Sequence, residues 1–308
     1  MAEARPTETH PTETHPTTEA PNPRSADLDR MSSLQIVTLM NDEDATVPAA
    51  IRPSLPMIAA AVDAITARLR AGGRLVYAGA GTSGRLAVLD AVECVPTFSV
   101  SPDLVTPLMA GGRAALTRSI EGAEDDVDLA LRDVDEAGVG NKDVLVGIAS
   151  SGGTKYVVAA LQAARERGAV TVAISNSEPA PILGLADFPI AVVTGPEVLS
   201  GSTRLKAGTA QKLVLNMLST ATMVRLGKVH GNRMVDVAVI NQKLRRRAEG
   251  IVADLVGCTP EAAAELLDAA DQEVKTAVLM GLADADAVTA RARLDAAGGY
   301  LRQALDDR

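Results

Sequence analysis

Aromatic and metal-binding side chains are scarce in this sequence. Its 308 residues contain no Trp, two Phe, three Tyr and three His, and the net charge is −9. Nucleic-acid binding calls for basic patches and stacking rings, so the composition argues against a nucleic-acid partner. Two of the three histidines, His10 and His15, lie close to the N-terminus. A histidine-based metal centre or catalytic triad therefore has almost no ligands to draw on, and we predict no metal site.

Cysteines and long apolar runs are also few. Cys94 and Cys258 lie far apart in the sequence, and we expect reduced thiols instead of a disulfide. The chain shows no secretory signal pattern at its start and no apolar run long enough to cross a bilayer. The sequence therefore predicts a cytoplasmic protein without a membrane partner.

The first 24 residues differ in composition from the rest. The pentapeptide Pro-Thr-Glu-Thr-His at positions 6–10 is repeated at positions 11–15. A segment rich in Pro and Thr and poor in apolar residues cannot bury a core, so we predict a disordered tail over 1–24. We interpret His10 and His15 as part of this solvated tail, in preference to a metal site.

Strand and helix patterns alternate through the middle of the chain. Short apolar runs without polar alternation are typical of strands covered on both faces, and alternation of strands with helices implies a parallel sheet. We therefore predict an α/β fold with three layers over residues 25–246, and a small helical bundle over the Ala-rich residues 247–308. The expected strands are 74–78, 104–109, 143–149, 170–175 and 190–194, with helices near 83–93, 113–136, 154–168 and 205–226.

A glycine-rich turn follows the first expected strand. The sequence Gly-Ala-Gly-Thr-Ser-Gly-Arg at 79–85 leads into a helix, and such a turn directs backbone N–H groups and the helix dipole toward an anion. Its spacing matches the dinucleotide fingerprint, but no second strand ends on the acidic residue that a ribose requires. The hydroxyls of Thr82 and Ser83 fit a phosphate monoester better, and Gly81 allows its close approach. These three residues are our first phosphate candidates.

A second hydroxyl-rich turn follows the strand expected at 143–149. It reads Ser-Ser-Gly-Gly-Thr at 150–154 and precedes another helix. In a parallel α/β sheet both turns lie at the carboxyl edge, where ligands bind. Ser150, Ser151 and Thr154 are therefore further candidates for holding the phosphate of a sugar. The alternative is that both turns are ordinary helix N-caps.

Two acidic residues and one basic segment are candidates for the chemistry. Glu93 lies about two and a half helical turns beyond the first loop, in an apolar setting suited to acid–base catalysis. Glu124 belongs to an acidic cluster at 121–126, which would equally stabilise the start of a helix. The cations of 201–212, Lys206 among them, suit an anionic substrate, and equally a surface or dimer contact.

Taken together, these motifs resemble the N-acetylmuramic acid 6-phosphate etherases, a family with the sugar isomerase (SIS) fold. The resemblance extends from about Thr18 to the end of the chain. It is carried by residues 79–85, 88–94, 121–126, 201–212 and 226–236. It implies a phosphosugar substrate and cleavage of its C3 D-lactyl ether by elimination and hydration, giving N-acetylglucosamine 6-phosphate and D-lactate. It also implies that two carboxyl groups suffice for this chemistry, with no metal and no cofactor.

The same resemblance implies roles for particular residues. Glu93 matches the glutamate that protonates the departing lactate oxygen, and Glu124 matches a second glutamate whose role is to remove the C2 proton. Gly153 and Lys155 depart from the family pattern, which has Arg and Pro at these places. The resemblance also implies a homodimer with the site near the subunit boundary.

The C-terminal bundle resembles a three-helix ubiquitin-associated domain, with helices expected over 259–267, 272–281 and 285–305. Two other functions remain open: a phosphosugar-binding regulatory protein without catalysis, and an aldose–ketose phosphosugar isomerase.

Overall fold

The structure, a computed structural model, describes residues 17–306 of the chain. Most of the expected N-terminal tail, including His10 and His15, lies outside the described residues. Residues 17–24 contradict the predicted disorder, because they contribute to the 3-10 turns η1 (Thr17–Glu19) and η2 (Pro23–Ser25), and Thr18 and Asn22 are buried. Asn22 caps η2 by accepting a hydrogen bond from the backbone of Arg24 at 2.9 Å. Side chains later in the chain also hold this segment, which the local composition does not reveal.

Five parallel strands form the single sheet of the body, in the order β2-β1-β3-β4-β5. They are β1 (Leu75–Gly79), β2 (Val105–Met109), β3 (Val144–Ile148), β4 (Val170–Ser175) and β5 (Phe188–Ala191). Gly79 at the end of β1 is level with Met109 and Ile148 at the ends of its two neighbours. The segments that leave these strands therefore begin side by side at one edge. The predicted α/β class with a parallel sheet is confirmed.

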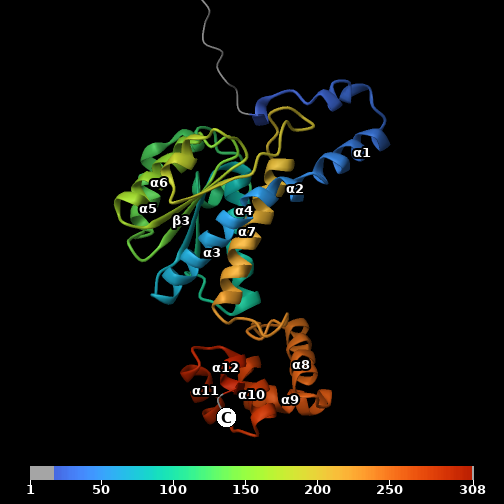
Figure 1. Ribbon diagram of the computed structural model, residues 1–308, viewed down its shortest axis with the longest axis vertical. Coiled ribbons are helices and arrows are strands. Elements are labelled where there is room, and N and C mark those ends of the chain that lie inside the picture. Colours follow the sequence, from blue (N-terminus) through green and yellow to red (C-terminus); the bar gives the residue numbers. More distant parts are fainter. Residues whose placement is uncertain (1–16, 307–308) are drawn as a thin grey trace, which may run out of the picture.

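Helices cover both faces of the sheet, as the uninterrupted apolar strands require. One face packs against α3 (Leu55–Arg70), α4 (Gly81–Phe98) and α7 (Lys206–Arg225), and the other against α5 (Val127–Glu136) and α6 (Lys155–Glu166). Alternate residues of β1 belong to the apolar cores on opposite faces of the sheet. Tyr77 belongs to the core that includes α3, α4 and α7, and Val76 belongs to the core that includes α5 and α6. Figure 1 shows α5 and α6 on one side of β3 and α3, α4 and α7 on the other.

One predicted helix is shorter than expected. The sequence pattern favours helix over 113–136, whereas the structure has the 3-10 turns η5 (Gly112–Leu116) and η6 (Ala123–Asp125) before α5 begins at Val127. Gly111 and Gly122 adopt positive φ just before these turns, and Asp126 caps α5 by accepting from the backbone N–H of Leu129 at 2.8 Å. The acidic cluster therefore lies in a turn that leads into a helix.

The N-terminal helices extend away from the sheet. Figure 1 shows α1 (Ser33–Asp44) outside the layered body, with α2 (Val47–Ile51), the turn η4 (Arg52–Ser54) and α3 leading back to it. By length and composition alone, the stretch 33–70 qualifies as a membrane-crossing helix, and it is the one such stretch within residues 17–306. By this criterion of length and composition, the prediction that no apolar run is long enough to cross a bilayer is therefore wrong. The same measure is met by core helices of folded domains, and in α3 Ile58, Ile65 and Leu69 are buried in the sheet core.

The C-terminal part is helical and has its own apolar cluster. It contains α8 (Gln242–Val256), α9 (Pro260–Ala269), α10 (Val274–Ala283), α11 (Ala287–Ala296) and α12 (Leu301–Asp306). The helix expected over 285–305 is divided in two, because Gly298 and Gly299 both adopt positive φ. The expected boundary between 246 and 247 falls inside α8. The remaining short turns are η3 (Leu28–Arg30) and η7 (Pro181–Leu185).

Candidate active site

The first turn of α4 provides uncapped backbone N–H groups at the sheet edge. The helix begins at Gly81, whose φ is 54°, and its N-cap residue Ala80 has no side chain that can accept a hydrogen bond. Ser83 is buried in this turn and Thr82 is half-buried. The turn lies very close to β1, because a Cβ on Gly84 would come within 2.7 Å of the Gly79 carbonyl oxygen. The orphan N–H groups of such a helix start suit an anion.

The second hydroxyl-rich turn lies at the same edge, after β3. The Ser150 hydroxyl accepts a hydrogen bond from Gln211 Nε2 at 2.8 Å, and the same nitrogen lies 2.9 Å from Asn176 Oδ1. The Ser151 hydroxyl accepts from the Gly153 N–H at 3.4 Å. Thr154 occupies the N-cap position of α6, but its side chain makes no capping hydrogen bond. The side chain of Thr154 therefore does not cap its helix. Thr82 and Ser83 are not N-cap residues either, because they lie inside α4.

Glu124 lies beside the first of these turns. A cavity of about 320 Å³ is lined by Glu124, Glu121, Arg118 and the α4 residues Gly81 and Arg85. The Arg85 guanidinium donates to the carbonyl oxygens of Leu116 at 3.2 Å and Arg118 at 3.1 Å. This arginine thereby fastens the segment that carries Glu124 to α4. Our sequence analysis did not assign it a role, although its place directly after Gly84 in the glycine-rich motif was a usable signal.

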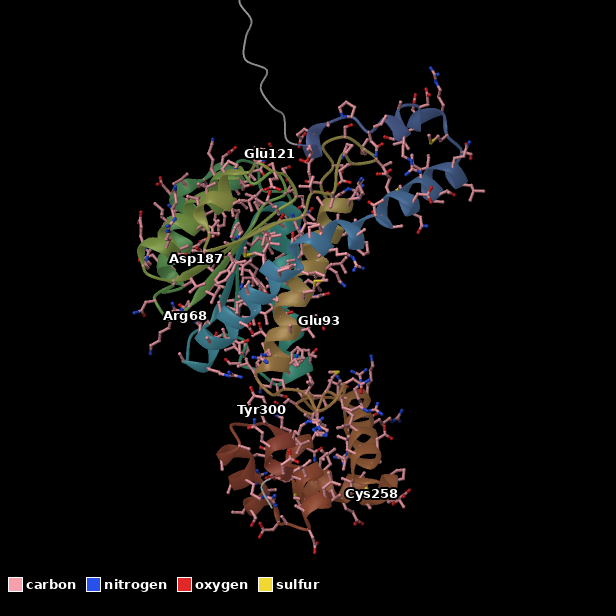
Figure 2. The ribbon with its side chains drawn as sticks, viewed as in Figure 1. Arg68, Glu93, Glu121, Asp187, Cys258 and Tyr300 are labelled. Atoms are coloured by element: carbon pink, nitrogen blue, oxygen red, sulfur yellow. The ribbon has the colours of Figure 1, made fainter. Side chains whose placement is uncertain are left out.

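Glu93 lies elsewhere on the same chain. It follows Gly81 by 12 residues in α4, a distance of about 18 Å along the helix. Its side chain is exposed on the outer face of the helix, beside Leu89 and Val92, which are 52% and 59% exposed. Figure 2 shows Glu93 beside the α4–α7 pair, well away from Glu121, which lies toward the other end of the layered body. One chain by itself does not bring Glu93 and Glu124 together.

Lys206 is engaged in a buried ion pair at the start of α7. It is 3% exposed, and its Nζ lies 2.6 Å from Glu43 Oε2. Burial of Glu43 would raise the pKa of its carboxyl group, but hydrogen bonds from Lys206, Arg24 and Asn22 bring that pKa below its usual value. The ammonium group thus fastens α1 to α7, and the structure does not place it in the cavity that Glu124 lines.

Neither a metal centre nor a reactive thiol is evident at the site. Across residues 17–306, no cluster of three or more His, Cys, Asp or Glu side chains has the arrangement to hold a metal ion. Cys94 is a buried free thiol on the inner side of α4, and burial, with a contribution from Asp90, raises its pKa to about 12. Such a thiol stays protonated and is inert as a nucleophile. The side chains that line the cavity beside the start of α4 include the carboxylates of Glu121 and Glu124 and the guanidinium groups of Arg85 and Arg118.

The parallel sheet with two hydroxyl-rich turns at one edge defines an SIS-domain protein. Residues 118–221 match the SIS domain family, and residues 57–165 match the glucokinase regulatory protein N-terminal SIS domain. A phosphoheptose isomerase from Francisella tularensis overlays with a TM-score of 0.49 at 16% identity, covering 63% of this chain and all of that one.

Longer matches define the family more narrowly. N-acetylmuramic acid 6-phosphate etherases from Streptomyces coelicolor and Mycolicibacterium smegmatis are 53% and 52% identical to this chain over 93% of its length, and the matches cover 92% and 96% of those proteins. The etherase from Escherichia coli is 50% identical over 94% of this chain and 97% of its own. The chain belongs to the N-acetylmuramic acid 6-phosphate etherase family.

Proposed function

We propose that this carbon–oxygen lyase cleaves the D-lactyl ether of N-acetylmuramic acid 6-phosphate by elimination and hydration, at sites that two subunits build together. Membership of the etherase family supports the substrate and the reaction. The observation that carries the rest of the proposal is the separation of Glu93 from Glu124. We also propose a cytoplasmic location, because a sugar that carries a phosphate does not cross a membrane unaided.

The phosphate of the substrate would bind at the sheet edge. The first turn of α4 offers N–H groups together with the hydroxyls of Thr82 and Ser83, and the turn after β3 offers Ser151 and Thr154. The N–H groups at a helix start and neighbouring hydroxyls both donate to phosphate oxygens. With the phosphate held there, the sugar would extend into the adjoining cavity that Glu124 lines.

Two carboxyl groups are sufficient for the proposed chemistry. In the open-chain sugar the C1 aldehyde acidifies the C2 proton, and Glu124 removes it as a base. The C3–O bond then breaks, a C2–C3 double bond forms, and Glu93 gives a proton to the departing lactate oxygen. Water adds across this double bond, with its hydroxyl at C3 and a proton returned to C2. The sum is one water consumed for each lactate released, by general acid–base catalysis alone.

A second copy of the chain would bring Glu93 to the cavity. Glu93 lies on a broad apolar face formed by α3, α4 and α7, whose exposed members include Leu55, Leu89, Val92 and Val224. A groove of about 960 Å³ runs between α3 and α7 on this face. An exposed apolar patch of this kind is typical of a protein interface, and a twofold pair places the same patch on both copies. We therefore propose a homodimer in which each site takes Glu124 from one chain and Glu93 from the other.

The activity is tested by incubating the purified protein with N-acetylmuramic acid 6-phosphate and measuring D-lactate and N-acetylglucosamine 6-phosphate. Equal amounts of both products are expected. Absence of lactate at high protein concentration would overturn the proposal. A sugar-phosphate interconversion assay would then distinguish an isomerase from a regulatory protein that only binds.

Mixed dimers test the shared site. The variants Glu93→Gln and Glu124→Gln are each expected to release no lactate. If the two glutamates act from different chains, mixing and exchanging the subunits restores one complete site in each mixed dimer, or about a quarter of the wild-type activity. If both act within one chain, the mixture stays inactive, and the shared site is rejected while the etherase activity stands.

A further inference from the structure

A buried carboxylate lies on the inner side of α4, one helical turn before Glu93. Asp90 is 6% exposed. Its Oδ2 accepts a hydrogen bond from the Tyr77 hydroxyl at 2.8 Å, and its Oδ1 accepts from Asn216 Nδ2 at 2.7 Å and from the Ser219 hydroxyl at 3.0 Å. Tyr77 belongs to β1, whereas Asn216 and Ser219 belong to α7. One side chain thus ties α4 to both elements beneath it.

All three donors to Asp90 are neutral, and no cation among the described residues pairs with it. Two of the other three buried carboxylates of the body, Glu43 and Asp143, pair with a cation, and the third, Glu197, is held by backbone N–H groups alone. Glu43 has Lys206, Asp143 has Arg74, and Glu197 accepts from two backbone N–H groups at the start of α7. Burial of a carboxylate without a counter-ion carries a desolvation penalty, which lowers the stability of the fold. An apolar side chain that joined the two helices would usually avoid this penalty. Stability alone therefore does not account for a carboxylate at this position.

Asn216 connects this buried group to the outer face. It is half-buried and lines the groove between α3 and α7. Its amide nitrogen is held by Asp90, which fixes the orientation of the carboxamide and leaves its oxygen and second N–H directed away from that bond. Asp90 and Glu93 are three residues apart, so they lie on adjoining sides of the same helical turn. Figure 2 shows Glu93 on the flank where α4 meets α7.

We propose that Asp90 is a positioning residue that acts through Asn216: the pair locks the α4–α7 seam and sets the orientation in which Glu93 meets the substrate. This inference rests on the proposed function, because it assigns Glu93 to the reaction. An acid must be held within a fraction of an ångström of the atom that it protonates, and a 1 Å displacement can lower the rate about a hundredfold. A carboxylate that accepts from two fixed donors on α7, Asn216 and Ser219, provides that restraint across the α4–α7 seam, whereas an apolar contact allows the helices to slide.

The experiment compares Asp90→Asn and Asn216→Ala with Tyr77→Phe. Asp90→Asn keeps the shape of the side chain, so the chain should still fold. Tyr77→Phe removes a donor from the other carboxylate oxygen, on the sheet side, and is the matched control. For the first two variants we expect kcat for lactate release to fall by about ten- to a hundredfold with KM changed less than about threefold. For Tyr77→Phe we expect kcat within about twofold of wild type at a comparable loss of thermal stability.

A conservative replacement adds a second measurement. The longer side chain of Asn216→Gln keeps a carboxamide N–H that can still reach Asp90, so this variant should retain more activity than Asn216→Ala. The proposal is overturned if all variants lose kcat in proportion to their loss of thermal stability, or if Asp90→Asn and Asn216→Ala keep wild-type kcat. Glu93→Gln, measured in parallel, distinguishes the role of Glu93 in the reaction from the positioning role of Asp90. Lactate release by that variant contradicts the proposed function, whereas its inactivity beside a fully active Asp90→Asn contradicts only the role of Asp90.

Discussion

The Lys206 ammonium group and the Glu43 carboxylate form an ion pair at 2.6 Å, with side chains that are 4% and 8% exposed. The two residues are separated by 163 positions in the sequence. Arg24 and Asn22 also donate to this carboxylate, at 2.7 Å and 3.1 Å. A single buried group therefore gathers the N-terminal turns, α1 and the start of α7 beside the edge of the sheet that carries the proposed site.

Replacement of Lys206 by Met should destabilise the protein strongly. The change leaves Glu43 buried with only part of its compensating charge, and breaking a buried pair in this way costs about 3 kcal/mol or more. Denaturant unfolding measures the loss. Lys212→Met, an exposed position on the same helix, is the control and should change the free energy of unfolding by less than about 0.5 kcal/mol. Equal effects of the two substitutions would show that the ion pair is not important for stability.

Acid should weaken the fold partly through Asp143. Burial would raise the pKa of this carboxyl group, but hydrogen bonds from Arg74 and from backbone N–H groups bring the pKa below its usual value of 3.8. A lowered pKa means that the stabilisation is complete above that value and is lost as the pH falls through the lower, folded-state value. Thermal midpoints of wild type and Asp143→Asn should therefore differ at pH 7 and converge as the pH falls below about 4.

The exposed Asp135→Asn is the control for this comparison, since Asp135 makes only a surface ion pair with Arg167. Its midpoint should follow that of the wild type at every pH. A constant gap between wild type and Asp143→Asn down to pH 2 would rule out the proposed linkage.

Gly84→Ala should displace α4 from β1. The added Cβ would lie 2.7 Å from the Gly79 carbonyl oxygen, which belongs to the backbone and cannot rotate away. We expect a loss of about 1–3 kcal/mol in the free energy of unfolding and weaker phosphosugar binding. Gly250→Ala in α8, where a Cβ meets nothing within 4 Å, should instead stabilise by roughly 0.5–1 kcal/mol. If Gly84→Ala behaved like Gly250→Ala, the close approach would have no structural importance.

Removal of the hydroxyls at the sheet edge should weaken substrate binding without loss of folding. Thr82→Val and Thr154→Val keep the side-chain shape and delete one donor each. Hydrogen bonds to a charged group are worth about 1.5–3 kcal/mol, so KM for N-acetylmuramic acid 6-phosphate should rise roughly tenfold or more in each variant. Thr289→Val, on the exposed surface of α11, should leave KM unchanged. An unchanged KM in both test variants would place the phosphate elsewhere.

Much of the body was predictable because its signals are local. Apolar runs without alternation marked several of the five strands, and the strand expected at 190–194 overlaps β5 only at residues 190–191. The glycine-rich sequence after the first strand marked the helix start that provides Gly81, Thr82 and Ser83. The two helix predictions that were wrong also have local causes. Gly122 interrupts the helix expected over 113–136, and Gly298 and Gly299 divide the last expected helix.

The partners of charged side chains were not predictable in this way. The motif around Lys206 suited either an anionic substrate or a surface or dimer contact. The partner of Lys206, Glu43, lies instead in a helix that the sequence gives no reason to place nearby. Nothing in the sequence around Asp90 indicates that its carboxylate accepts hydrogen bonds from Tyr77, Asn216 and Ser219, because Asn216 and Ser219 lie in a distant helix.

The sequence by itself determined the α/β class, the two hydroxyl-rich turns and the family, because each of these features depends on residues that are close together in the sequence. Only the tertiary structure decided that Glu124 shares a cavity with the start of α4 while Glu93 lies on an outer apolar face. The reason is geometric: the helix that begins at Gly81 carries Glu93 about 18 Å away along its axis, and the direction of a side chain from that helix depends on how α4 packs against α7 and β1.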